Sequence, residues 1–180
     1  MRKVMVGLAA IAMLAVAVPT VAASTVPPYC GIRWGSLPKE AGPLVPGPVT
    51  NARAGQHACY DRLVIDLKGK ASGYAVEYVP QVTQEGSGAL VPLRGGAKLQ
   101  ISVRAPAYDV NTGSETLPTA RSELVNVSGF RTFRQVAGAG SFEGYTAVGL
   151  GVRGRLPFRV FTLAGPGAGS RLVIDVAHRW

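Results

Sequence analysis

The sequence predicts an all-β fold: an antiparallel two-sheet β-sandwich preceded by a Pro/Gly-rich arm and a signal-peptide helix. The first observation is a repeat, because Arg-Leu-Val-Ile-Asp occurs at residues 62–66 and again at residues 171–175. The second is the alternation of apolar and polar residues, which is clearest over residues 98–104. The third is the regular spacing of glycine-rich turn sequences between short apolar runs. Together these features are typical of an antiparallel sandwich or barrel, and we expect the sandwich.

Residues 1–23 have the features of a signal peptide. Two cations at positions 2 and 3 precede an apolar run over residues 4–18, and small residues follow at 21–23. This order is the one that a signal peptidase recognises, so we expect cleavage after Ala23. An uncleaved membrane anchor is the alternative, but the run is shorter than the ~20 residues of a spanning helix. We therefore expect a secreted, extracytoplasmic protein with no transmembrane segment in the mature chain.

Residues 24–58 are predicted to form an arm, because prolines and glycines prevent regular ladders over most of this stretch. Its apolar exception, residues 32–35, predicts a short strand or a plug. The two cysteines of the chain are Cys30 and Cys59. In an exported protein an even pair predicts a disulfide. Reduced thiols or a metal pair are the alternatives, although two isolated cysteines lack the clustering of a zinc site.

Residues 59–180 are predicted to form the β-sandwich domain. Alternate apolar residues of the first repeat, such as Leu63 and Ile65, share one face of a strand, and the second repeat has the same pattern. We interpret the two copies as strands that open and close one domain, with chance recurrence as the alternative. The other predicted strands are residues 74–79, 89–93, 98–104, 123–127, 132–136, 145–152 and 158–163, with turns at 86–88, 95–96, 111–113, 138–140 and 165–167. Residues 107–119 are predicted to be a long surface loop.

Positive charge is concentrated in the C-terminal part of the chain. The formal net charge is +9 overall, of which residues 121–180 contribute +5, entirely through arginines. Arginine binds carboxylates and phosphates in a bidentate manner, and several arginines on one face would favour an anionic polymer. The predicted ligand-binding residues are Arg131, Arg134, Arg153, Arg155 and Arg159. The alternative is that these arginines only solvate the outward faces of strands.

The sequence gives little support for catalysis. The chain has two histidines and neither an HExxH pair nor a Gly-x-Ser-x-Gly turn. A Ser-His-Asp arrangement stays open because it is spatial, and a glycosidase would require two carboxylates that converge on one cleft. We expect no enzyme activity, no cofactor and no metal site.

Nucleic acid is not an expected partner. Phenylalanine and arginine alternate over residues 130–134 and 158–161, which in a cytoplasmic protein would indicate stacking and phosphate contacts. The predicted export of the chain argues against this partner. Phenylalanines that face the core beside arginines that face outward are the simpler interpretation.

Several separated motifs occur in the order found in one known family. They lie at residues 32–37, 60–67, 73–79, 141–144, 149–152, 158–161 and 171–176. Together they resemble AMIN-like domains of secreted actinobacterial proteins. The resemblance implies that this chain, like domains of the wider AMIN family, forms a two-sheet sandwich and acts as a non-catalytic localisation module with peptidoglycan or envelope partners. No amidase, LysM or secretin segment accompanies the motifs, so we expect the domain to stand alone.

These observations lead to one preferred function and two alternatives. We expect an exported, non-catalytic cell-envelope binding module that recognises peptidoglycan or an anionic wall glycopolymer. The first alternative is a protein-interaction or scaffold domain of the envelope that pairs through an exposed sheet edge. A hydrolase that uses Glu143 or Asp66 is the second.

Overall fold

The computed structural model describes residues 27–180, so the predicted signal peptide and its cleavage site lie outside the described residues. A short 3₁₀ turn, η1 (Tyr29–Gly31), precedes the strands. The strands are β1 (Lys39–Ala41), β2 (Val49–Gln56), β3 (Tyr60–Leu67), β4 (Tyr74–Val79), β5 (Val82–Thr83), β6 (Leu90–Val91), β7 (Ala97–Val103), β8 (Phe133–Phe142), β9 (Tyr145–Val152), β10 (Phe158–Ala164) and β11 (Ser170–Ala177).

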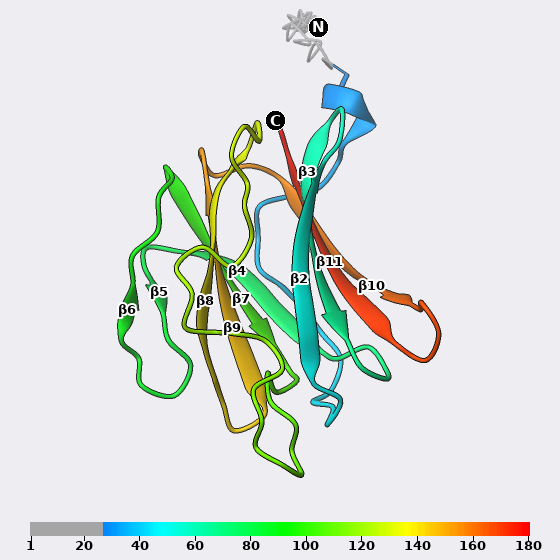
Figure 1. Cartoon of the computed structure of the whole chain (residues 1–180). Coiled ribbons are helices and arrows are strands. Elements are labelled where there is room, and N and C mark those ends of the chain that lie inside the picture. Colours follow the sequence, from blue (N-terminus) through cyan, green and yellow to red (C-terminus); the bar gives the residue numbers. More distant parts are fainter. Residues whose placement is uncertain (1–26) are drawn as a thin grey trace, which may run out of the picture.

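The strands form two facing sheets (Figure 1). Sheet A has the order β1-β4-β7-β9-β8 and sheet B has the order β10-β11-β3-β2, while β5 and β6 form a small separate hairpin. Every pairing is antiparallel. Alternate apolar residues of both sheets meet in one core, with Leu63 and Ile65 from sheet B and Ile101 and Leu150 from sheet A fully buried. The prediction of an antiparallel two-sheet sandwich is confirmed.

The two copies of Arg-Leu-Val-Ile-Asp lie side by side in the middle of sheet B. Strand β3 pairs with β11 so that Val64 stands opposite Val173, and the flanking residues match in reverse order. Arg62 of one copy therefore lies opposite Asp175 of the other. This register agrees with the interpretation of the two copies as strands that open and close one domain, because the copies are hydrogen-bonded neighbours.

The outer face of sheet B carries an ionic cluster. Asp175 is fully buried and accepts hydrogen bonds from Nε of Arg62 at 2.7 Å and Nε of Arg159 at 2.8 Å. The hydrogen bond to Asp175 raises the pKa of Arg62 above its ordinary value. Aromatic rings cover the guanidinium groups, since Trp34 lies 4.4 Å and Phe161 5.0 Å from that of Arg159. This cover excludes water from the carboxylate, which strengthens the ion pairs.

Strand β2 lies inside the range 24–58, for which the sequence suggested few regular ladders. It pairs with β3 along most of its length, and Val49 at its start is fully buried. The physical reason is that the last proline of the range is Pro48, so the backbone beyond it keeps its hydrogen-bond donors. Residues 32–35 form no strand in the described part of the chain.

The predicted disulfide between Cys30 and Cys59 is present, with a Cα–Cα distance of 6.2 Å. It joins η1 to the residue before β3 across 29 positions of sequence. A bond that closes a loop of this length contributes roughly 3–4 kcal/mol in the chain-entropy model. The disulfide therefore fixes the start of the arm against sheet B.

Two sequence predictions were wrong near strand β8. Residues 138–140 were expected to form a turn but lie inside β8, where a Cβ on Gly138 would meet the carbonyl oxygen of Thr119 at 2.2 Å. Gly138 allows the backbone of β8 to approach that of Thr119 closely. The register with β9 shifts between Gly138 and Ser141, where the strand forms a bulge. Residues 123–127 form one isolated bridge, Val125 to Val136, instead of a strand.

Candidate functional site at the arginine-rich end of the sandwich

One end of the sandwich, the upper end in Figure 1, is where both sheets are joined by a buried carboxylate. Asp61 of β3 is fully buried and accepts hydrogen bonds from the backbone N–H groups of Thr132 at 2.6 Å and Phe133 at 3.0 Å. Its other oxygen lies 3.1 Å from Nε2 of His178. Asp61 thereby fixes both the segment before β8 and the segment after β11.

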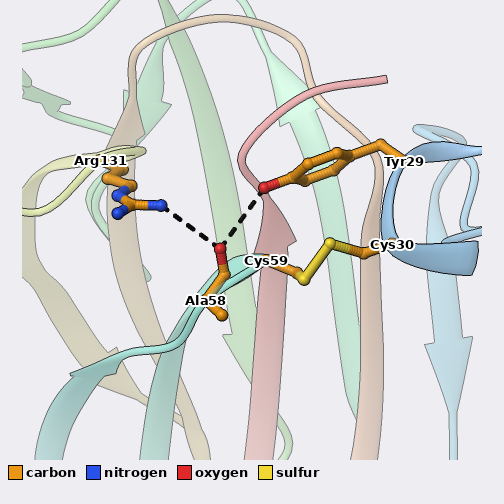
Figure 2. Close-up of a disulfide and its surroundings, with 5 residues drawn as sticks. All are labelled: Tyr29, Cys30, Ala58, Cys59 and Arg131. Atoms are coloured by element: carbon orange, nitrogen blue, oxygen red, sulfur yellow. Dashed lines mark hydrogen bonds between the residues drawn. A yellow bond between two sulfur atoms is a disulfide. The ribbon is translucent and has the colours of Figure 1, made fainter.

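Four arginines lie on the segments at this end: Arg131 before β8, Arg153 and Arg155 after β9, and Arg179 after β11. Arg131 donates to the carbonyl oxygen of Ala58 at 3.4 Å, and Tyr29 donates to the same oxygen beside the disulfide (Figure 2). The guanidinium of Arg179 lies 4.3 Å from the ring centre of Tyr29. Together, Arg131, Arg153, Arg155 and Arg179 define the arginine-rich end.

The other two arginines of this end are also oriented by the protein backbone. Arg153 donates to the carbonyl oxygen of His178. Arg155 donates to the carbonyl oxygen of Ser36 at 3.0 Å, and its own carbonyl oxygen accepts the indole N–H of Trp180 at 3.0 Å. Each guanidinium is thus held by carbonyl groups, which fix its direction without neutralising its charge.

No carboxylate within residues 27–180 forms an ion pair with any of these four arginines. The ion pairs of arginine in the described chain use Arg53, Arg62, Arg94, Arg104 and Arg159. Arg131, Arg153 and Arg155 are exposed, as is Arg179. The end therefore presents uncompensated positive charge to solvent, which attracts anions.

The structure brings together three of the five arginines that the sequence singled out: Arg131, Arg153 and Arg155. Arg134 turns back to donate to the carbonyl oxygens of Phe130, Arg131 and Phe133, in a separate depression that it shares with Arg94 and Glu123. Arg159 lies on the outer face of sheet B, where Asp175 takes up its charge.

Sequence reasoning missed Arg179 and the neighbouring aromatic residues of this end. Trp180 is 65% exposed although its indole N–H is hydrogen-bonded, so its ring faces solvent in a fixed position. The available signal was the position of Arg179 and Trp180 a few residues after the second copy of the repeat, at the same end as Cys59.

A second depression offers a weaker site. It has a volume of about 600 Å³ and lies between the β6 region and β8, lined by Leu90, Leu93 and Gln135 among others. Its polar groups are already paired: Gln135 accepts from the backbone N–H of Arg94 at 2.8 Å and donates to the carbonyl oxygen of Ser122 at 2.8 Å. Few free polar groups remain there to select a ligand.

Within residues 27–180, no group of three or more His, Cys, Asp or Glu side chains gathers in a way that could hold a metal ion. Of the two histidines, His178 is bound to Asp61, and His57 stacks on Tyr60 with 4.6 Å between ring centres. In the same part of the chain, no helix has the length and apolar character needed to cross a membrane.

The model of the AMIN-like domain family matches residues 47–178, which is most of the chain and includes both sheets apart from β1. No curated protein matches the sequence. Domains of this family are modules of the cell envelope and are generally non-catalytic. The extent of the match, together with the sandwich and the paired repeat that closes it, means that this chain belongs to the AMIN-like domain family.

Proposed function

We propose that this protein is an exported, non-catalytic binding module that captures peptidoglycan or an anionic wall glycopolymer through its arginine-rich end. The observation that carries the proposal is that four exposed arginines share one end of the sandwich without a carboxylate partner in the described chain. Membership of a family of envelope modules supports the choice of an envelope polymer.

The geometry favours a polymer over a small ion. The contacts of this end spread over segments before β8, after β9 and after β11, so the charges form a surface and not a single pocket. A guanidinium has five N–H donors, and the carbonyl contacts of Arg153 and Arg155 leave donors for carboxylate or phosphate groups. Because the arginines are exposed, binding should weaken strongly as salt is added.

The test is sedimentation with purified cell walls at rising ionic strength. A variant with Arg131, Arg153, Arg155 and Arg179 changed to Gln is compared with a control in which Lys68, Lys70, Arg94 and Arg121 are changed to Gln. Both variants lose the same formal charge. Four exposed contacts of about 0.2–1 kcal/mol each sum to about 0.8–4 kcal/mol, so the first variant should bind at least about fourfold more weakly, while binding by the control should change little. Equal binding by the two variants, or no sedimentation of the wild type at low salt, would contradict the proposal.

A second candidate function, pairing with an envelope protein through a sheet edge, is favoured by strand β10. This strand is one of the two edges of sheet B, and Thr162, Leu163 and Ala164 are exposed along it. The N–H of Phe158 points outward to the carbonyl oxygen of Gly35, so by alternation the N–H of Thr162 also points away from β11. Thr162→Pro should therefore abolish crosslinking to a partner in wall-free extract without breaking the β10–β11 ladder; unchanged crosslinking would exclude this edge.

A further inference from the structure

A cavity of about 310 Å³ opens beside Arg155 at the arginine-rich end. It lies where the neighbouring strands β4 and β7 meet the segment after β9, and its lining includes Tyr78, Val79, Ala97, Lys98 and Arg155. The Gly95-Gly96 turn closes against the segment after β9 at this point, because a Cβ on Gly96 would lie 2.4 Å from the carbonyl oxygen of Arg153. The cavity is thus built into the same end that carries the uncompensated arginines.

Arg155 is held at the edge of this cavity in a fixed orientation. Its Nε and Nη2 atoms donate to Oγ and the carbonyl oxygen of Ser36, at 3.2 and 3.0 Å, and its guanidinium lies 5.0 Å from the ring centre of Tyr78. Tyr78 is itself fixed, because its hydroxyl donates to the carbonyl oxygen of Leu156 at 2.9 Å and accepts from the N–H of Leu156 at 3.0 Å. Nη1 of Arg155 has no partner among residues 27–180, so it is left for a ligand.

The lining of the cavity combines positive charge with apolar surface. Lys98 is its second cation, and the contact of its Nζ atom within the described chain is a long one, 3.4 Å to the carbonyl oxygen of Pro80. No carboxylate lies in the lining. The remaining walls, which include Val79, Ala97 and the ring of Tyr78, offer apolar contact. A ligand that suits this lining has an anionic group at one side and a C–H face at the other.

We propose that the cavity binds one anionic sugar unit, a pyranose that carries a carboxylate or a phosphate, with Arg155 and Lys98 contacting the anionic group and Tyr78 lying against the ring. This assignment rests on the proposed function, because it names the unit of the anionic polymer that the arginine-rich end would capture. The volume is at the lower limit for small-ligand pockets, about 300 Å³, and is larger than an inorganic anion requires.

The test is a titration of the full chain, followed by NMR, with glucuronate and glucose 6-phosphate as two separate probes. Glucose and inorganic phosphate serve as controls that carry only the ring or only the anion. Lys98→Gln and Arg155→Gln should each weaken binding of the preferred probe about fivefold, which corresponds to one exposed ionic contact of about 1 kcal/mol. Arg131→Gln, at the same end but outside the cavity, should leave the affinity for the sugar unchanged and reduce wall sedimentation. A preference for glucuronate or for glucose 6-phosphate identifies the anionic group.

Equal binding of glucose or of inorganic phosphate, or unchanged affinity in both cavity variants, would overturn the assignment. Wild-type protein that sediments with walls but binds neither probe would overturn this inference and leave the proposed function intact. Sugar binding without wall sedimentation would overturn the proposed function instead. Thermal melting of Lys98→Gln and Arg155→Gln shows whether each is folded. The Nζ atom of Lys98 makes one long hydrogen bond in the described chain, so its variant should test the cavity with little effect on the fold.

Discussion

The two copies of Arg-Leu-Val-Ile-Asp contain the same side chains, but their carboxylates lie in different environments. Asp175 is fully buried between Arg62 and Arg159. The side chain of Asp66 is 22% exposed and is paired with Arg53, whose side chain is 50% exposed, at 3.0 Å. Arg171 stands opposite Asp66 in the register but forms no ion pair among residues 27–180.

The difference arises from the neighbouring strands and not from the repeat itself. On the β11 side, β10 supplies Arg159 and Phe161, and the arm adds Trp34 above them. On the β3 side, β2 supplies Arg53 and Asn51, and both contact Asp66 from solvent-exposed positions. An identical pentapeptide thus becomes a buried ionic cluster in one place and an ordinary surface pair in the other.

Asp175→Asn should have the largest effect, a loss of about 3–5 kcal/mol in the free energy of unfolding, because it leaves two arginines around a buried group without charge. Denaturation by urea measures the loss. Circular dichroism of the variant before denaturation is the control for folding. A cost below about 1 kcal/mol would mean that the cluster is solvated and that the two copies do not differ.

Loss of the disulfide should have the next largest effect. Changing both Cys30 and Cys59 to Ser is expected to cost about 2–4 kcal/mol, because the unfolded chain regains the freedom that the closed loop removes. The change should also loosen the arm that carries Trp34 and shift tryptophan fluorescence to longer wavelength. Reductant should reproduce both effects in the wild type and neither in the double variant. An unchanged spectrum would show that the arm is held by its other contacts.

Trp34→Ala tests the aromatic cover directly. Its ring contacts the guanidinium of Arg159 and, edge to face, the ring of Tyr60 at 5.6 Å. The expected cost is about 1–2 kcal/mol. In double-mutant cycles the change should couple to Arg159→Met and be additive with Arg53→Met, because Arg53 pairs with Asp66, which is not among the residues that Trp34 contacts. Equal coupling to both arginines would contradict this difference.

Asp66→Asn should have the smallest effect, below about 1 kcal/mol, since both partners of this pair contact water. Raising the salt concentration from about 0.1 M to about 1 M shortens the screening length from about 10 Å to about 3 Å and should remove most of the remaining effect. The cost of Asp175→Asn, measured in parallel, should change little with salt. A loss from Asp66→Asn as large as that from Asp175→Asn would show that exposure does not separate the two copies.

The sequence predicted best those strands whose own residues carry a strong period. Strand β9 has the bounds expected from residues 145–152, and β7 and β10 lie within a residue or so of their predicted ranges. Strand β2 was not predicted, because its inward residues include Ala52 and Ala54, whose small side chains give a weak hydrophobic signal. The glycines of β8 were misread because their role depends on the approach of Thr119, which is distant in sequence.

The candidate site was only partly predictable for a similar reason. The excess of arginine in residues 121–180 is visible in composition, but which arginines meet depends on which strand ends share one end of the sandwich. Arg153 and Arg155 come together with Arg179 because the segments after β9 and β11 end at the same place. Arg159, four residues beyond Arg155, is placed by its strand against Asp175 instead. Spacing along the chain does not contain this information.

The pairing of the repeat with itself also bears on how the protein reaches its folded state. The antiparallel register around Val64 and Val173 matches arginine with aspartate at both ends, so two β3 segments or two β11 segments from different molecules could form the same ladder. Strands β2 and β10 favour the pairing within one molecule over the pairing between molecules, because they occupy the remaining edges of β3 and β11 in the folded sheet. Refolding at high protein concentration should therefore yield strand-exchanged dimers, whereas dilute refolding should favour the single molecule.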